Sequence, residues 1–236
     1  MKYYKVKSDL NPKVVGSDYP QSWQFTKEYE KRENNPNAVY ALSECIRNFR
    51  VPDFVPDLDG YVLSGRAKRT NFISIVTPNT LFVDEQTKNI LQSKCNLGEH
   101  NFYEALLYVR NEKNKYYCLG LFYDLKSVIE YNKCGYVIYG INDEKDLPEE
   151  WFTKPINSFS DISNIRERYR DYPGIVMILC NKLTLKRFFN KNQDFYRLSL
   201  PDENVYGICT ERFKDAVEEA GLTGLVFEPI EVEIEE

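Results

Sequence analysis

The residues of this chain whose types and spacing could do chemistry include three carboxylates near position 57. Asp57 and Asp59 are separated by one leucine, and Asp53 precedes Asp57 by four positions. An Asp-x-Asp pair of this kind can hold a divalent cation beside a nucleotide-sugar substrate, because hard cations prefer carboxylate oxygens. Prolines and a glycine flank the pair, and in that setting aspartate side chains more often bond backbone amides within a turn. We therefore predict a turn and keep a carboxylate-dependent enzyme as an alternative function.

His100 is the one histidine of the chain. It could act as a general base beside Glu99 or Glu104, but proton transfer also needs a nucleophile and an orienting partner. The sequence reveals neither of these groups. We expect a turn or surface histidine.

Six cysteines are scattered along the chain without a Cys-x-x-Cys pair. They are Cys45, Cys95, Cys118, Cys134, Cys180 and Cys209. A zinc site would need an all-cysteine or carboxylate set, and no spacing typical of such a site occurs. Cys209 alone stands before a predicted helix start, where a thiol can become reactive. It aligns with the apolar Val83 in the internal alignment given below, so we expect reduced, mostly buried thiols.

Two short basic runs could contact phosphate groups. They are Arg66-Ala67-Lys68-Arg69 and Arg166-Glu167-Arg168-Tyr169-Arg170, and the second includes a tyrosine that could stack on a base. The whole chain has 31 basic and 36 acidic residues and a net charge of −5, so no general positive field attracts nucleic acid. We expect solvated faces and keep a phosphate- or nucleic-acid-binding module as a second alternative.

The common signatures of nucleotide sites and hydrolases are missing from the sequence. It contains no GxGxxG, Walker loop, GxSxG or HExxH. We therefore predict no catalytic centre, no cofactor-binding residue and no metal site, and we expect the protein to act by binding another protein.

The composition predicts a folded protein rather than a disordered one. Of the 236 residues, 42% are hydrophobic and 14% aromatic, which suffices for a packed core. We expect one α+β unit over residues 1–236, with a conceivable division into subdomains 1–145 and 146–236. The amino-terminal residues lack the apolar region of a signal peptide, and the longest apolar run, Gly174–Cys180, is too short to span a bilayer. These features predict a cytoplasmic location and no membrane partner.

The pattern of apolar residues predicts strands and helices that alternate along the chain. Strands are expected at 61–63, 72–76, 102–109, 116–122, 135–141, 174–180 and 195–200, the last half-buried and alternating, with a turn at 111–114 that joins two of them as a hairpin. The tail 231–236 is expected to be an edge strand. We predict a mixed or mainly antiparallel sheet with helices packed on it.

Helix starts and stops are predicted from capping residues. Asp84 should cap a helix over 85–94, and Thr210 should cap an amphipathic helix that ends at Gly221. Other helices are expected near 162–169, from Asp124 to Tyr131, and after Thr184.

Two of the predicted strand-helix-strand segments resemble each other. When residues 82–91 (FVDEQTKNIL) are set over residues 208–217 (ICTERFKDAV), an apolar strand end, a capping residue, a glutamate and a lysine coincide. After one inserted residue, Leu97 and Phe102 fall on Leu222 and Phe227. This pattern is that of two copies of one unit, although convergence of common supersecondary motifs would give the same pattern.

The carboxyl-terminal segment GICTERFKDAVEEAGLTGLVFEPIEVEI resembles the signature of a bacterial immunity-protein family, formerly a domain of unknown function, whose members accompany polymorphic toxins. The matching positions are Thr210-Glu211-Arg212, Ala220, Gly221-Leu222-Thr223-Gly224, Phe227 and Pro229. The segment from Val83 through Asn89 to Phe102 and Tyr103 is similar to an upstream part of such proteins, so the resemblance covers about half of the chain. It implies an immunity protein that binds and blocks a cognate toxin. Each matching residue has a structural task, so no partner-contacting residue is carried over.

Overall fold

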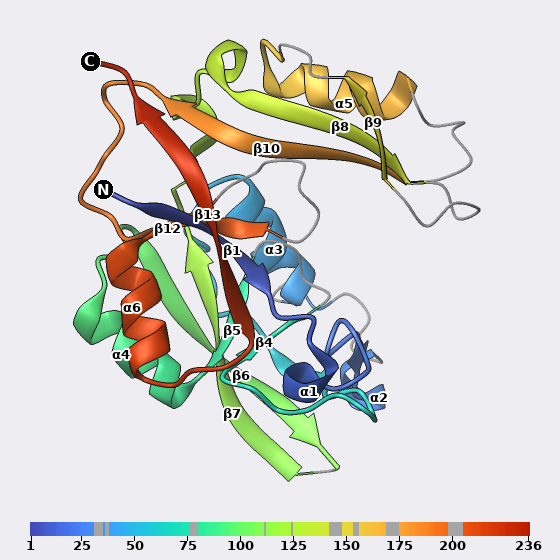
Figure 1. Ribbon diagram of the computed structural model, residues 1–236. Coiled ribbons are helices and arrows are strands. Elements are labelled where there is room, and N and C mark those ends of the chain that lie inside the picture. The colour runs from blue at the N-terminus through green and yellow to red at the C-terminus, as the bar shows by residue number, and fades with distance from the viewer. Residues whose placement is uncertain are drawn as a thin grey trace.

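Figure 1 shows an α+β protein built from two mixed β-sheets with helices packed on them. The computed structural model describes residues 1–30, 35, 38–75, 80–110, 112–123, 125–141, 148–152, 156–168, 175–197 and 205–236. Within these residues, each sheet has one parallel strand pair and is otherwise antiparallel. The predicted fold class is confirmed.

The first sheet has six strands in the described part of the chain. Their order is β2 (Gln24–Phe25), β3 (Asp59–Val62), β6 (His100–Val109), β7 (Glu112–Leu121), β5 (Leu81–Asp84) and β4 (Phe72–Ile73). The helices of this part are α1 (Pro12–Val15), α2 (Lys27–Glu30), α3 (Val39–Arg47) and α4 (Glu85–Lys94).

The second sheet has seven described strands. Their order is β11 (Phe195–Arg197), β12 (Val205–Thr210), β1 (Tyr3–Ser8), β13 (Leu225–Ile234), β10 (Ile175–Leu185), β8 (Gly135–Ile141) and β9 (Pro148–Phe152). The associated helices are α5 (Phe159–Arg168) and α6 (Glu211–Glu219), together with the short 3-10 helices η1 (Leu125–Val128) and η2 (Tyr131–Lys133).

Several elements lie where the sequence predicts them. The helix over 85–94 and the strand over 135–141 have the predicted bounds, and the helix near 162–169 falls within α5. Asp84 caps α4, because its Oδ1 accepts a hydrogen bond from the backbone N–H of Thr87 at 2.8 Å. The predicted hairpin is β6 and β7, although β7 begins at Glu112, so the turn is shorter than predicted. Residues 76, 111, 124, 169, 174 and 198–200, on which parts of these predictions fall, lie outside the described residues.

Three predictions about local structure are wrong. No helix follows Thr184, which lies within β10 and whose hydroxyl donates to the carbonyl of Lys133 at 3.0 Å. Of the apolar residues after it, Leu185 ends β10 and is buried, Phe189 is buried in the core, and Phe188 is exposed. The described part of 195–200, β11, is not half-buried, because all three of its residues are buried. The tail is not an edge strand, since 231–234 pair with β10 in parallel inside the sheet.

Thr210 stands at the predicted N-cap position of α6 but does not cap it with its side chain. Its hydroxyl donates instead to Asp194 Oδ1 at 2.7 Å. The helix nevertheless starts after Thr210, as predicted. It also ends as predicted, because Gly221 adopts the left-handed backbone (φ 63°) that ends a helix without strain.

The two sheets repeat one arrangement of strands. The order β4-β5-β7-β6-β3-β2 in the first sheet corresponds to β11-β12-β1-β13-β10-β8 in the second. Each corresponding pair of neighbours is antiparallel, except that β3 is parallel to β6 and β10 is parallel to β13. We call the first set of strands with α4 the first unit, and the second set with α6 the second unit. The second unit is completed by β1, which comes from the amino terminus.

The register of strand pairing also agrees between the units. Equivalent residues, the first unit before the second, are Asp84 and Thr210, Tyr116 and Tyr3, Leu119 and Val6, and Phe102 and Phe227. The equivalence of Phe102 with Phe227 is the one given by the sequence alignment. It also places Lys115-Tyr116-Tyr117 of β7 on Lys2-Tyr3-Tyr4 at the start of β1.

Equivalent side chains make equivalent contacts. The ammonium of Lys88 in α4 lies over the ring of Tyr117 at 4.0 Å, and the ammonium of Lys214 in α6 lies over the ring of Tyr4 at 5.4 Å. The two helices pack side by side (Figure 1). One buried cluster draws on both units, including Val83, Leu91, Leu119, Cys209, Phe213 and Val217. The two related strand-helix-strand units suggested by the sequence are therefore present and share a core.

The conceivable division at residues 145 and 146 falls outside the described residues and stays a prediction. The sheets show a different connection, because β1 pairs only with strands of the second unit. None of the described helices is long and apolar enough to cross a membrane.

We expect deletion of residues 1–8 to abolish cooperative folding, because it removes the strand between β12 and β13 and leaves the backbone groups of both neighbours unpaired. A circular permutant that begins at Asn11 and joins Glu236 to Met1 through a glycine-rich linker should fold, since it returns β1 to the same place. Circular dichroism during urea unfolding checks both variants. A truncated chain that unfolds at the same urea concentration as the full chain would contradict the role of β1.

Candidate functional site

The three carboxylates near residue 57 do not converge on one point. Asp57 Oδ1 accepts from the backbone N–H of Asp59 at 3.3 Å, which is the predicted turn. Asp59 Oδ1 accepts from the hydroxyl of Tyr108 at 2.8 Å, and Asp53 is exposed. Within the described residues, no group of three or more His, Cys, Asp or Glu side chains is arranged to hold a metal ion. This geometry gives no support to the carboxylate-dependent alternative.

His100 begins β6 and is held by local contacts. Its Nδ1 lies 2.8 Å from the carbonyl oxygen of Gly98, and its ring meets that of Phe102 edge-on at 5.5 Å. Neither contact is to a nucleophile, so the expected turn or surface role fits the structure.

All six cysteines are free thiols, as expected. Cys45, Cys118, Cys180 and Cys209 are buried, and burial raises the pKa of Cys118 to about 12. Cys134 differs, because a hydrogen bond from the Cys180 thiol and another from the Thr184 N–H lower its pKa to about 7 despite partial burial. The structure thus singles out Cys134 as the thiol most easily ionised among those with a resolved shift.

The first basic run is engaged in surface contacts. Arg66 pairs with Asp18 at 3.1 Å, Lys68 donates to the carbonyl of Lys13 at 2.8 Å, and Arg69 donates to Asn114 Oδ1. The second run lies partly outside the described residues, so a shared face for the two runs stays untested.

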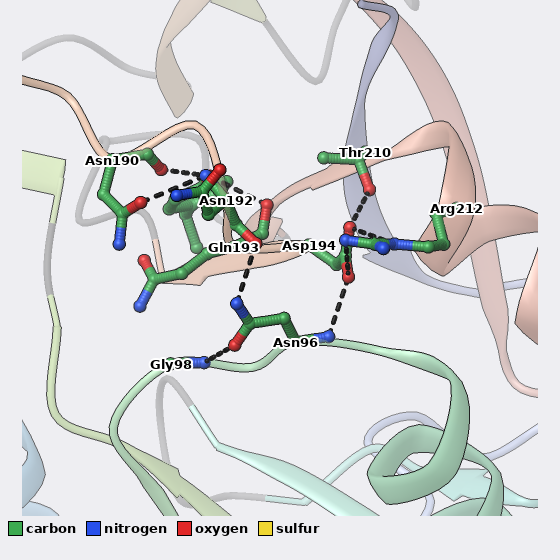
Figure 2. Close-up of polar contacts among 9 residues, drawn as sticks. Asn96, Gly98, Asn190, Asn192, Gln193, Asp194, Thr210 and Arg212 are labelled. Carbon is green, nitrogen blue, oxygen red and sulfur yellow. Dashed lines mark hydrogen bonds and ion pairs between the residues drawn. The ribbon is translucent and has the colours of Figure 1, made fainter.

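The most strongly held charge in the second unit is the carboxylate of Asp194, which lies just before β11 (Figure 2). Its side chain is only 2% exposed. Oδ2 accepts from the backbone N–H of Asn96 at 2.7 Å and lies 2.8 Å from Nη2 of Arg212; Oδ1 accepts from the Thr210 hydroxyl at 2.7 Å and from Arg212 Nε at 2.9 Å. The buried charge is therefore paired and fully hydrogen-bonded, as burial of a carboxylate requires.

These partners come from both units. Thr210 and Arg212 belong to the end of β12 and the first turn of α6, whereas Asn96 lies in the loop that follows α4 of the first unit. Asp194 also donates its own backbone N–H to the carbonyl of Asn96 at 2.7 Å. The cluster in Figure 2 thus fastens the strand of one unit to the helix-exit loop of the other.

The first unit has an equivalent cluster with different chemistry. Asn71, just before β4, takes the place of Asp194: its carbonyl accepts from the backbone N–H of Asp84 at 3.0 Å, as that of Asp194 accepts from Thr210 at 2.9 Å. Asn71 Oδ1 accepts from the backbone N–H of Thr223, in the loop after α6, at 2.9 Å. Asn71 Nδ2 donates to Asp84 Oδ2 at 2.8 Å. In the second unit the carboxylate belongs to the residue before the strand, whereas in the first unit it belongs to the helix cap, Asp84.

A cavity of about 440 Å³ opens beside this first-unit cluster. It is lined by Arg69, Thr70, Asn71, Asp84, Glu85, Gln86, Asn114, Lys115, Tyr116 and Thr223. The walls come from the start of β4, the first turn of α4, the start of β7 and the loop after α6. Its size is within the range of ligand sites, and its lining is mainly polar.

A second surface feature is apolar. Four of the exposed large apolar side chains lie within residues 40–55: Tyr40, Phe49, Val51 and Val55. Ala38 and Asp57 form a β-bridge, so the segment 48–57 returns along α3. We call these four side chains the α3 surface.

The C-terminal end of α3 is tied to the second unit. The buried guanidinium of Arg197 in β11 donates to the carbonyl of Ile46 and lies 5.0 Å from the ring of Phe49. Phe49 also lines a mostly apolar hollow of about 490 Å³ with Phe122, Tyr123, Lys126 and Ser127. The α3 surface is thus anchored on a rigid element, next to a hollow that could receive an apolar side chain.

Sequence reasoning did not single out Asp194, Asn71 or the α3 surface. A sequence signal for the first two was present, because Asn71 and Asp194 each directly precede a phenylalanine. In the structure, these phenylalanines pair with Val83 and Cys209, which are equivalent residues of the two units. Tyr40 and Val55 carry no motif, so only their exposure in the fold identifies them.

Comparison of the chain with protein-family models, with curated proteins and with solved structures gives no match.

We expect Asp194→Ala to lower the free energy of unfolding by about 3 kcal/mol, because it leaves Arg212, Thr210 and the Asn96 N–H without their shared acceptor. Urea unfolding followed by tyrosine fluorescence measures the change. Asp215→Ala, which removes an exposed carboxylate from α6, is the control and should stay within about 0.5 kcal/mol. Equal effects of the two substitutions would show that Asp194 does not hold the units together.

We expect Cys134 to react with iodoacetamide faster as pH rises through about 7, since its lowered pKa makes the thiolate available there. Cys95 is also only partly buried, but burial raises its pKa to about 12, so it should remain slow over the same range. Mass spectrometry of the labelled peptides at pH 6 to 9 gives both profiles. Parallel profiles would show that the neighbours of Cys134 do not favour its thiolate.

Proposed function

We propose that this protein is an immunity protein that binds and neutralises a cognate bacterial toxin by protein–protein contact in the cytoplasm. The observation that carries the proposal is the α3 surface, four exposed apolar side chains on α3 and the segment that follows it, with Phe49 lining an apolar hollow. The resemblance of residues 207–234 to an immunity-protein signature supports the same function. Exposed apolar side chains that form one patch favour a protein partner.

The signature residues themselves build the fold. Gly224 has φ 106°, and a Cβ there would lie 2.1 Å from the carbonyl oxygen of Phe72. Phe227 packs edge-on against Phe213 at 6.3 Å. Because these residues are committed to the core and to the contact between units, we assign toxin binding to other surfaces.

The charges around the α3 surface balance. Glu44 and Asp53 are exposed beside Arg47 and Arg50, and Arg47 pairs with Glu44 at 3.3 Å. Without a net charge, long-range attraction adds little there, and the gain comes from burying apolar area, at about 25 cal/mol per Å². We therefore expect contact through the α3 surface to depend only weakly on salt.

The two alternative functions have less support. The carboxylates of an enzyme site should converge in a cavity, but Asp57 and Asp59 accept hydrogen bonds from an amide, a backbone N–H and a hydroxyl along a turn, and Asp53 is exposed. The described basic run is paired with acidic and carbonyl groups, and the net charge is negative. Protein binding accounts better for the exposed apolar side chains.

Co-expression with the toxin domain encoded by a neighbouring gene tests the proposal. We expect the wild-type protein to restore growth and to co-purify with the toxin in a fixed ratio. The double variant Tyr40→Ser and Val55→Ser should fold normally, because these side chains are 73% and 84% exposed, yet bind at least tenfold more weakly through loss of apolar contact.

Phe188→Ser is the matched control. Phe188 is also strongly exposed, at 65%, but lies outside the α3 surface, so its loss should leave growth rescue unchanged. Failure of every well-expressed neighbouring toxin to bind would remove the proposal. Equal loss of growth rescue with both variants would not contradict toxin binding by this protein. It would show that the α3 surface is not the specific binding site.

A further inference from the structure

The two equivalent clusters differ in how their carboxylates are compensated. In the second unit, Asp194 is paired with Arg212 at 2.8 Å, and Glu211 is paired with Lys2 at 2.9 Å. Each of these two carboxylates therefore has a cation of its own.

In the first unit, the carboxylates at the start of α4 have neutral donors instead. Asp84 accepts from the Thr87 N–H and from Asn71 Nδ2, each at 2.8 Å, and Glu85 accepts from the Tyr117 hydroxyl at 3.3 Å. Across the described part of the chain, no ion pair involves Asp84 or Glu85.

The residues that supply cations in the second unit have changed in the first. The equivalent of Arg212 is Gln86, and the equivalent of Lys2 is Lys115, whose ammonium pairs with Glu104 at 2.8 Å. Where the second unit has the partly exposed guanidinium of Arg212 against its carboxylate, the first has the cavity of about 440 Å³. The first unit thus lacks the cationic group that completes the second.

The remaining charges at this cavity leave room for a cation. Arg69 is exposed and donates to Asn114, whereas Lys115 is neutralised by Glu104. Two carboxylates, Asp84 and Glu85, and two cations, Arg69 and Lys115, line the cavity, and the pairing of Lys115 with Glu104 leaves Arg69 alone against the two carboxylates. The N-terminus of α4 opposes a cation through its dipole, but Arg212 occupies the same position on α6, which shows that a guanidinium is accommodated when a carboxylate faces it.

We propose that the cavity beside Asp84 and Glu85 is a recognition site for a basic side chain, above all the guanidinium of an arginine presented by the partner protein. The inference rests on the proposed function only for the identity of the protein that carries the arginine. The arginine takes the place that Arg212 fills in the second unit, with two charge-assisted hydrogen bonds to the carboxylates.

A capped tripeptide, acetyl-Gly-Arg-Gly-amide, tests the chemistry without the toxin. Titrated into the ¹⁵N-labelled protein, it should shift the amide signals of residues 84–87 in a saturable way, with a dissociation constant on the order of 1 mM for one exposed contact. The same peptide with citrulline, which is neutral and nearly the same shape, should give no saturable shift. Equal binding of arginine and citrulline peptides would overturn the proposal.

A third peptide, acetyl-Gly-Glu-Gly-amide, tests whether the cavity prefers a negatively charged side chain instead. Saturation by this peptide alone would assign the cavity to a carboxylate held by Arg69 and Lys115, and would also overturn the proposal. No shift with any of the three peptides has the same consequence.

Transplanting the second-unit cluster into the first unit should close the site. The triple variant Asn71→Asp, Asp84→Thr and Gln86→Arg recreates the arrangement of Asp194, Thr210 and Arg212, which is already present in the second unit. We expect the variant to keep its circular dichroism spectrum and to lose the arginine-peptide shift, because the guanidinium introduced by Gln86→Arg occupies the place of the peptide's guanidinium.

A single isosteric change keeps the test independent of the triple variant's folding. Glu85→Gln retains the acceptor for the Tyr117 hydroxyl and should weaken arginine-peptide binding about threefold, through loss of one partly exposed charge. Glu99→Gln, an exposed substitution at the far end of β6, should leave binding unchanged. Toxin binding without peptide binding would refute the arginine site alone, whereas peptide binding without a toxin would refute the proposed function alone.

Discussion

The carboxylate of Asp194 is the interaction on which the joining of the two units depends. A buried charge is unfavourable unless donors surround it, and here the donors come from the loop after α4, the end of β12 and the first turn of α6. None of these segments can shift without exposing the charge or removing a donor. The position of the second unit relative to the first is therefore set by electrostatics as well as by the shared apolar core.

The same constraint explains why the two units repeat a fold but differ in composition. A strand residue in each unit must accept a hydrogen bond from the helix-exit loop of the other, and both Asp194 and Asn71 do so. The rest of each cluster varies with the position of its negative charge. With the charge on the strand, Thr210 donates to it and Arg212 covers it; with the charge on the helix cap, Asn71 donates and Asp84 stays beside a cavity. Equivalent backbones thus support one closed cluster and one open one.

Local elements of this fold could be predicted from the sequence, whereas the partners of the strands could not. α4 is specified by its capping residue Asp84, and α6 by its apolar period and the helix stop at Gly221. β1 was not recognised, because its neighbours β12 and β13 lie some two hundred residues away. The same distance hid the interior position of the tail. Thr184 was misread because a threonine before apolar residues fits a helix start as well as a strand, and only pairing with β13 decides between them.

The candidate sites were harder to predict for a related reason. Motif searches look for residues close in sequence, such as Asp57 and Asp59, and these form the turn that their neighbours favour. The cavity instead combines residues near 70, 85, 115 and 223. Once the fold is known, the internal repeat helps to identify such a site. Each residue of the first unit can then be compared with its equivalent in the second unit. Gln86 carries no signal on its own; set against Arg212, it marks the place where this chain lacks a cation that its own architecture can hold.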